Sequence, residues 1–133
     1  MTCVYPAIFT QLESGGYAIR FPDLPGTNSE GKNMPDALYM ARDALASWID
    51  YLMDEKSPIP KASIPYTGKV GPGEIITLID ADMDAYRRRK NSKAVKKTLT
   101  IPSWLNEEAE AANINFSSVL QDGLKERLNL QDR

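Results

Sequence analysis

The sequence predicts an α+β protein of two small units, and three observations lead to this prediction. Short segments rich in β-forming residues and bounded by glycine and proline fill the beginning of the chain, which is typical of antiparallel strands. Apolar residues then recur at helical spacing from Ala37 to about Asp54. The end of the chain gives one strand pattern followed by two helix patterns. With 133 residues, the chain has room for one ordinary domain or two very small ones.

The chain begins with a predicted hairpin and a third short strand. CVYPAIFTQLE is rich in β-forming residues, ESGG supplies a turn, and Tyr17, Ile19 and Phe21 share one face of the next strand. PDLPG interrupts the pattern, and TNSEG is predicted as the third strand. Asn33 then fits the N-cap of the main helix, with Pro35 in its first turn. We expect the apolar face of that helix to cover the sheet.

A long loop precedes the last strand of this unit. Residues 57–73 contain four prolines and three glycines, which argue against regular structure until EIITLI starts a strand at Glu74. That strand ends in DADMDAYRRRK, where we expect the aspartates to cap a short helix and to pair with its arginines. We place the boundary near residue 92, which gives an N-terminal unit at 1–92 and a C-terminal unit at 93–133.

Charge is strongly segregated along the chain. Residues 1–84 carry six cations and twelve anions, a balance of −6, and residues 107–133 carry three cations and six anions. Residues 85–106 carry no anion and seven cations, namely Arg87, Arg88, Arg89, Lys90, Lys93, Lys96 and Lys97. Such a basic island is either a solvated linker or, beside a strand, the electrostatic footprint of a contact with a nucleic-acid backbone.

The segment KKTLTI has the alternation of a half-buried strand. Because side chains alternate between the faces of a strand, Leu99 and Ile101 face one way while Lys96, Thr98 and Thr100 face the other. The apolar pair is therefore predicted as core, and the polar face is predicted to be exposed.

Two short helices follow this strand. Pro102 stops the strand and Ser103 is predicted to cap the first helix. Asn113 suits the left-handed turn that ends that helix. Asn115, or a serine just after it, is predicted to cap the second helix, whose apolar stripe includes Leu120 and other residues at helical spacing.

A strand with two helices is too small to be stable alone, and its single strand has two unpaired edges. Pairing with a second copy solves both problems, because two strands then form an antiparallel ribbon above four helices. Such a ribbon fits the major groove of DNA, where lysine donates to guanine and threonine contacts bases. We therefore predict a homodimer that buries Leu99 and Ile101 and presents Lys96, Thr98 and Thr100 to DNA.

Two stretches of the chain resemble known families. KKTLTIPSWLNEEAEAANINFSSVLQDGLKERL resembles a ribbon-helix-helix DNA-binding domain. GYAIRFPDLPG, MPDALYMARDALASWI and IDADMDAYRRRK, in this order, are similar to the N-terminal domain of HicB-type antitoxins. The two resemblances cover nearly the whole chain. One departure is Asn113, where relatives are expected to have glycine, but asparagine tolerates the same backbone conformation.

The resemblance implies a fold, two partners and a set of binding residues. It implies a partly formed ribonuclease-H-like antiparallel sheet with one main helix at 1–92, which binds a small HicA-type mRNA-cleaving toxin, and a ribbon-helix-helix unit at 93–133. That unit would repress the shared operon by binding operator double-stranded DNA. The base-facing positions are then Lys96, Thr98 and Thr100, and the dimer core is Leu99 and Ile101. The backbone near Asn115, Phe116 and Ser117 is expected to hold a phosphate. The assembly is a homodimer, with a tetramer as a further option.

Two other classes of function remain open at this stage: a ribbon-helix-helix regulator whose N-terminal unit binds a small effector, and a metal-dependent nuclease. Asp80, Asp82 and Asp84 form the one carboxylate cluster that suggests metal chemistry. A calcium loop starting there needs glycine and glutamate where Ala85 and Asn91 stand. A two-metal nuclease needs carboxylates from several elements, which this pattern does not supply.

Composition argues against most catalytic classes. The chain contains no histidine and a single cysteine, Cys3, which removes the commonest general base and the commonest zinc ligand. We therefore predict no enzymatic activity, no cofactor and no metal. No apolar run approaches the roughly 18 residues that a membrane span requires. We expect a cytoplasmic protein without a membrane contact.

Overall fold

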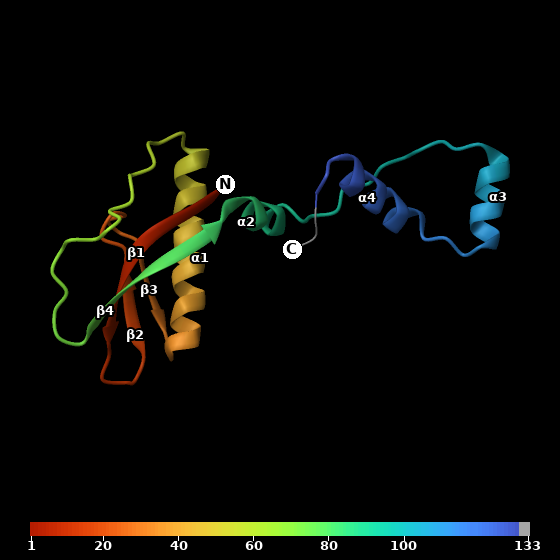
Figure 1. Ribbon diagram of the computed structural model, residues 1–133. Helices are drawn as coiled ribbons and strands as arrows, with labels where there is room; N and C mark the ends of the chain where they lie inside the picture. The colour runs from red at the N-terminus through yellow and green to blue at the C-terminus, as the bar shows by residue number, and fades with distance from the viewer. Residues whose placement is uncertain (131–133) are drawn as a thin grey trace. The chain divides into compact units, whose positions relative to one another are not determined.

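The computed structural model describes residues 1–130, and the chain divides into two compact units, Met1–Ser92 and Lys93–Arg133 (Figure 1). We call them unit 1 and unit 2. Unit 1 holds all four strands and two helices, and the described part of unit 2 holds two helices. Among residues 1–130, no helix combines the length and the apolar character needed to cross a bilayer.

Unit 1 is built on a four-stranded antiparallel sheet. Its strands are β1 (Thr2–Gln11), β2 (Tyr17–Arg20), β3 (Asn28–Gly31) and β4 (Glu74–Asp82), in the spatial order β3-β2-β1-β4. The hairpin, the third strand and the returning strand are therefore confirmed. β4 runs on past the predicted EIITLI because it pairs with β1 along almost its whole length. This topology leaves β3 and β4 at the two edges of the sheet.

A long helix, α1 (Met34–Asp54), covers one face of the sheet (Figure 1). Asn33 caps it as predicted, since its side-chain oxygen accepts a hydrogen bond of 2.9 Å from the N–H of Asp36. Side chains from α1, the sheet and the adjoining segments form one core: Tyr5, Ala7, Phe9, Ile19, Phe21, Leu24, Ala37, Ala41, Leu45, Ala46, Ile49, Ile79, Ala81 and Met83. The core fixes α1 across the strands and leaves the opposite face of the sheet uncovered by a helix.

The edge strand β3 packs very closely on α1, and glycine makes this possible. A Cβ atom on Gly31 would lie 2.3 Å from the Cα atom of Ala37, far inside van der Waals contact. Any larger residue at this position would push β3 away from the helix.

The short helix α2 (Met83–Lys90) follows β4 directly. The Asp82 side chain caps it by accepting a hydrogen bond of 3.1 Å from the N–H of Ala85. The predicted short helix and its aspartate cap are therefore confirmed. Met83 is buried in the core of unit 1, so α2 begins as part of that unit.

Unit 2 contains α3 (Ser103–Ala111) and α4 (Phe116–Arg127). The turn between them has Asn113 at φ 55°, the left-handed conformation expected from the sequence. Asn115 caps α4, because its side chain accepts a hydrogen bond of 3.0 Å from the N–H of Ser118. Both helix predictions and both asparagine roles are confirmed.

Two details of unit 2 differ from the predictions. Lys96–Ile101 forms no strand in the single chain, because a strand exists only as part of a ladder and no segment within residues 1–130 pairs with it. Ser103 is not the cap of α3. Pro102 occupies the cap position without a side-chain hydrogen bond, and its carbonyl accepts from the N–H groups of Leu105 and Asn106.

Candidate functional site

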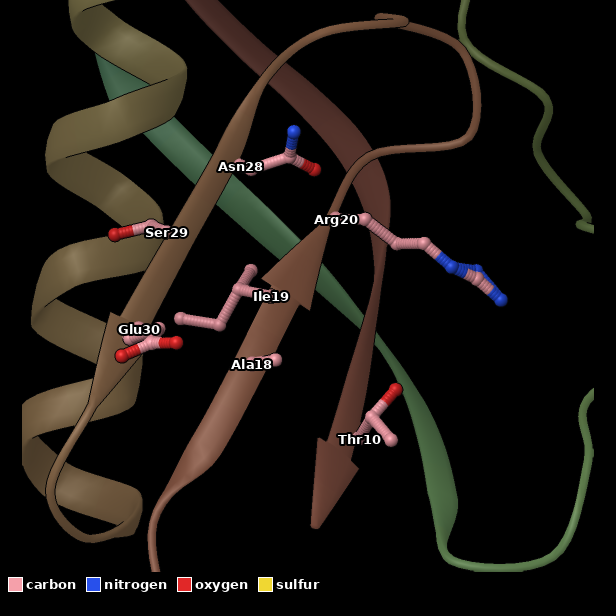
Figure 2. Close-up of a pocket in the computed structure, with 7 residues that line it drawn as sticks. All are labelled: Thr10, Ala18, Ile19, Arg20, Asn28, Ser29 and Glu30. Atoms are coloured by element: carbon pink, nitrogen blue, oxygen red, sulfur yellow. The ribbon is translucent and has the colours of Figure 1, made fainter. Parts of the chain in front are cut away.

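A shallow hollow lies along strands β1, β2 and β3 of the sheet (Figure 2). Its volume is about 410 Å³, and its lining comes from β1, β2 and β3: Thr10, Ala18, Ile19, Arg20, Asn28, Ser29 and Glu30. The register explains this set, since Thr10 lies opposite Ala18 and Arg20 lies opposite Asn28 in neighbouring strands. Period-2 alternation thus places most of the lining on one face of the sheet, whereas Ile19 and Ser29 belong to the other face.

The Glu74 carboxylate near this hollow is held by three hydrogen-bond donors. One Glu74 oxygen lies 2.9 Å from Nη2 of Arg20 and accepts from the Thr10 hydroxyl at 3.2 Å, while its other oxygen accepts from the N–H of Gly71 at 2.7 Å. The Gly71 N–H and the Arg20 guanidinium hold the pKa of Glu74 below its usual range. These contacts stabilise the ionised form, so Glu74 is poorly suited to act as a general base.

The edge strand β4 exposes apolar side chains. Leu78 is 55% exposed and Ile76 is 36% exposed on the open face, and Ile75 is exposed on the other side of the strand. The partners of Leu78 and Ile76 in β1 are Pro6 and Ile8, which are both buried, so the exposed apolar surface is confined to β4. We call Ile76 and Leu78 the apolar strip. An exposed apolar edge strand is a template for pairing with another chain, and such patches mark protein interfaces.

The three aspartates after this strip have separate partners. Asp80 forms an ion pair of 2.8 Å with Arg42, whose hydrogen bond and charge lower the pKa of that carboxyl. Asp82 caps α2, and Asp84 lies 2.6 Å from the terminal ammonium of Met1. Within residues 1–130, no three acidic or cysteine side chains gather as metal ligands do. The expected pairing of Asp80 and Asp84 with the α2 arginines is wrong, because nearer cations take these carboxylates.

The cations of α2 instead reach α1. Both oxygens of Asp50, which is 4% exposed, are held: Oδ1 lies 3.0 Å from Nε of Arg87 and Oδ2 lies 2.5 Å from Nζ of Lys90. Asp54 adds contacts of 3.0 Å to Arg87 and 3.6 Å to Lys90. The hydrogen bond with Asp50 raises the pKa of Lys90. We call these four residues the α1–α2 clamp, which nothing in the sequence spacing suggests.

In unit 2, the residues predicted to bind DNA all lie at the surface. Lys96, Thr98 and Thr100 are exposed in the segment before α3. Asn115, Phe116 and Ser117 are exposed at the start of α4. The Asn115 side chain satisfies the N–H of Ser118, and the N–H groups of Phe116 and Ser117 keep no acceptor within the described residues. The two groups of residues occupy separate segments of unit 2.

The predicted dimer core is also exposed in the single chain. Leu99 is 63% exposed and Ile101 is 42% exposed. Among the described residues 93–130, no side chain is buried. The large apolar side chains exposed there are Val95, Leu99, Ile101, Trp104, Leu105, Ile114, Phe116, Val119, Leu120, Leu124, Leu128 and Leu130. Unit 2 thus has the residues of a core without burying any of them.

Comparison with known proteins places the chain in a family. Residues 4–71, just over half of the chain, match the family of HicB-like antitoxins of bacterial toxin–antitoxin systems. The chain belongs to this HicB-like antitoxin family. The matched residues run from β1 to the loop before β4, so they lie within unit 1. The HicB-like character of the sequence, expected from its N-terminal motifs, is confirmed.

Curated relatives of this HicB-like chain include named antitoxins. It is 36% identical over 56 residues to antitoxin HicB 1 of Photorhabdus laumondii, a match that covers 42% of this chain and 36% of the relative. It is 32% identical over 59 residues to antitoxin HicB of Escherichia coli, covering 44% and 43%. The matched part thus spans less than half the length of either antitoxin. A 14.9 kDa protein of Haemophilus phage HP1 is 26% identical over 106 residues, covering 77% and 75%.

Solved structures share the fold over nearly the whole chain. A toxin–antitoxin complex from Streptococcus pneumoniae has a chain that matches with a TM-score of 0.57 at 23% identity, covering 96% of this chain and 99% of that one. Antitoxin HicB of Burkholderia pseudomallei matches with a TM-score of 0.53 at 19% identity, covering 95% and 98%. At this identity the likeness shows the α+β fold of the HicB-like chain.

Proposed function

We propose that the chain is an antitoxin with two activities. Residues 1–92 bind and neutralise a small HicA-type mRNA-cleaving toxin, and residues 93–133 repress the shared operon by binding operator DNA as a ribbon-helix-helix dimer. Family membership supports the first activity. The second rests on one observation, namely that unit 2 carries the apolar residues of a core and buries none of them in the single chain.

In the proposed dimer, the segments Lys96–Ile101 of two chains pair as an antiparallel ribbon. This pairing satisfies the backbone groups that one chain leaves open and buries Leu99 and Ile101 against the four helices. The alternation then presents Lys96, Thr98 and Thr100 to the major groove, where a two-stranded ribbon fits. The free N–H groups at the start of α4 suit a phosphate, because a helix N-terminus favours negative charge.

In unit 1, we propose that the toxin docks on the apolar strip of β4. The strip is flanked by Glu74 and Asp80, and residues 1–84 have an excess of six negative charges. An RNA-cleaving toxin needs a basic surface to bind its substrate, so the two charge patterns attract each other. The sheet, a partly formed ribonuclease-H-like fold, serves here as a binding platform without catalysis of its own. Both activities belong in the cytoplasm.

Toxin neutralisation is tested by adding the purified chain to a HicA-type toxin encoded beside it and following cleavage of a model mRNA. We expect cleavage to stop near one chain per toxin. Operator binding is tested separately by gel shift on the chain's own promoter. If the toxin stayed active while a small ligand changed promoter binding, the chain would be an effector-sensing regulator instead. Magnesium-dependent RNA cleavage that Asp82→Asn abolishes would indicate a nuclease.

A third experiment addresses base reading. Replacing Thr98 and Thr100 by alanine is expected to lower the preference for operator over scrambled DNA by about tenfold, since base-edge contacts carry sequence discrimination. The dependence of affinity on salt should stay unchanged, because threonine carries no charge. Lys96→Ala should lower both the preference for the operator and the dependence of affinity on salt. Gel-shift titration at two salt concentrations measures these effects. If a variant with alanine at Lys96, Thr98 and Thr100 kept the wild-type preference for operator over scrambled DNA, the segment would not enter the groove.

A further inference from the structure

The seven cations of the basic island do not share one environment. Arg87 and Lys90 are held in the α1–α2 clamp by Asp50 and Asp54, at distances of 2.5 to 3.6 Å. Arg88 and Arg89 are exposed and make no hydrogen bond or ion pair within residues 1–130. The sequence YRRRK alone does not distinguish these two pairs.

Helix geometry explains the division. Successive residues turn by about 100° around a helix axis, so Arg87 and Lys90 lie within about 60° of each other on one face. Arg88 and Arg89 then project from the remaining surface of α2. Because Asp50 is almost fully buried and both of its oxygens are held by α2 cations, rotation of the helix would leave an unpaired charge in the core. The clamp therefore fixes the rotation of α2 and leaves Arg88 and Arg89 exposed.

Most carboxylates near the exposed pair are already paired with other cations. Arg89 borders a groove between α1 and α2, where Arg42 is paired with Asp80, and Lys90 is paired with Asp50 and Asp54. The C-terminal end of α2 is thus a cationic spot on a unit whose first 84 residues are acidic. Such a spot attracts a phosphate backbone, and it is unsuited to the basic toxin.

Chain length keeps this spot near the proposed DNA-reading segment, whatever the arrangement of the two units. Lys96 lies six positions after Lys90, and a fully extended chain spans at most roughly 3.6 Å per residue, or about 22 Å here. That distance corresponds to about six base pairs of duplex at 3.4 Å each. Phosphates within this reach meet the arginines at a high effective concentration once unit 2 is bound.

We propose that Arg88 and Arg89 form a second, sequence-independent contact with DNA, on phosphates that flank the half-site bound by unit 2. Arg87 and Lys90 hold α2 to unit 1 and take no part in that contact. This inference rests on the proposed operator binding. It adds a direct contact between the toxin-binding unit and the DNA, so that flanking phosphates are bound by residues outside the ribbon-helix-helix unit.

The test compares the full-length chain with Arg88→Ala/Arg89→Ala in promoter binding between 50 and 200 mM salt. A dimer loses four phosphate contacts, so the slope of log affinity against log salt should become shallower by about 3.6. The ratio of operator to scrambled affinity should stay the same, because phosphate contacts carry no sequence information. Lys61→Ala/Lys69→Ala removes the same charge from exposed sites of unit 1 and is the matched control. Its slope should equal that of the wild type.

Two further variants make the outcome decisive. Arg88→Lys/Arg89→Lys keeps the charge and should restore most of the slope. Lys90→Ala should lower the thermal midpoint of the chain and leave the slope unchanged. Equal slopes in the arginine-free variant and its control would overturn the inference, and so would a loss of slope in Lys90→Ala. A wild-type chain that fails to bind its promoter would instead refute the proposed function.

Discussion

Replacing Leu99 by aspartate is expected to turn the dimer into monomers and to unfold the helices of unit 2. In the proposed ribbon this side chain is enclosed by four helices, although it is 63% exposed in one chain. The change removes a buried leucine, which costs about 2–5 kcal/mol, and adds an unpaired carboxylate, which costs several more. A small dimer with a stability of about 5–15 kcal/mol does not survive this loss. Ile101→Asp should behave in the same way.

Light scattering on the full-length chain measures the mass, and circular dichroism measures the helix content that belongs to α3 and α4. The matched control is Thr98→Asp, which places the same charge one residue away on the opposite face of the segment. It should keep the dimer and the helices and lose only DNA binding. If Leu99→Asp stayed dimeric with its helices intact, Leu99 would lie outside the dimer core and the ribbon would be refuted. A mass of four chains for the wild type would support the tetramer option.

Local rules predicted a large part of this structure. Asn33 and Asn115 cap α1 and α4 because a short polar side chain suits a helix start, and Asn113 takes the left-handed turn because asparagine tolerates it. The long apolar repeat of α1 gives most of its buried face, namely Ala41, Leu45 and Ile49, although Leu38 at the same spacing is 42% exposed. Each of these features depends on a few neighbouring residues, so one sequence is enough to find it.

Features that depend on distant partners were missed. Asp50 lies within the apolar repeat of α1, and only the fold brings it next to Arg87 and Lys90, which are about 40 positions away in the chain. The segment Lys96–Ile101 was predicted to form a strand by pairing with a second chain, and that pairing stays a prediction because the structure holds one chain. The edge position of β4 also follows from topology alone. For this reason EIITLI was predicted as a strand from the sequence, but the exposure of Leu78 was not predicted.

Replacing Leu78 on the exposed edge strand β4 by lysine is expected to weaken toxin binding by at least a hundredfold. The toxin would bury this side chain on the apolar strip, and central apolar contacts contribute about 2 kcal/mol or more to an interface. A lysine there loses the contact and also opposes the positive charge of an RNA-binding partner. The fold should tolerate the change, since Leu78 is 55% exposed and lysine is common on edge strands.

Leu38→Lys is the control for this experiment, because Leu38 is 42% exposed on α1, away from the strip, and receives the same substitution. Calorimetric titration of the toxin into each variant measures affinity, and thermal unfolding checks that both remain folded. Promoter binding should be the same in the two variants, because neither residue belongs to unit 2 or to the cations of α2. A folded Leu78→Lys chain that binds the toxin as tightly as Leu38→Lys would show that the strip is not the docking surface. The toxin would then have to bind elsewhere on unit 1, where the hollow beside Arg20 is the next surface to test.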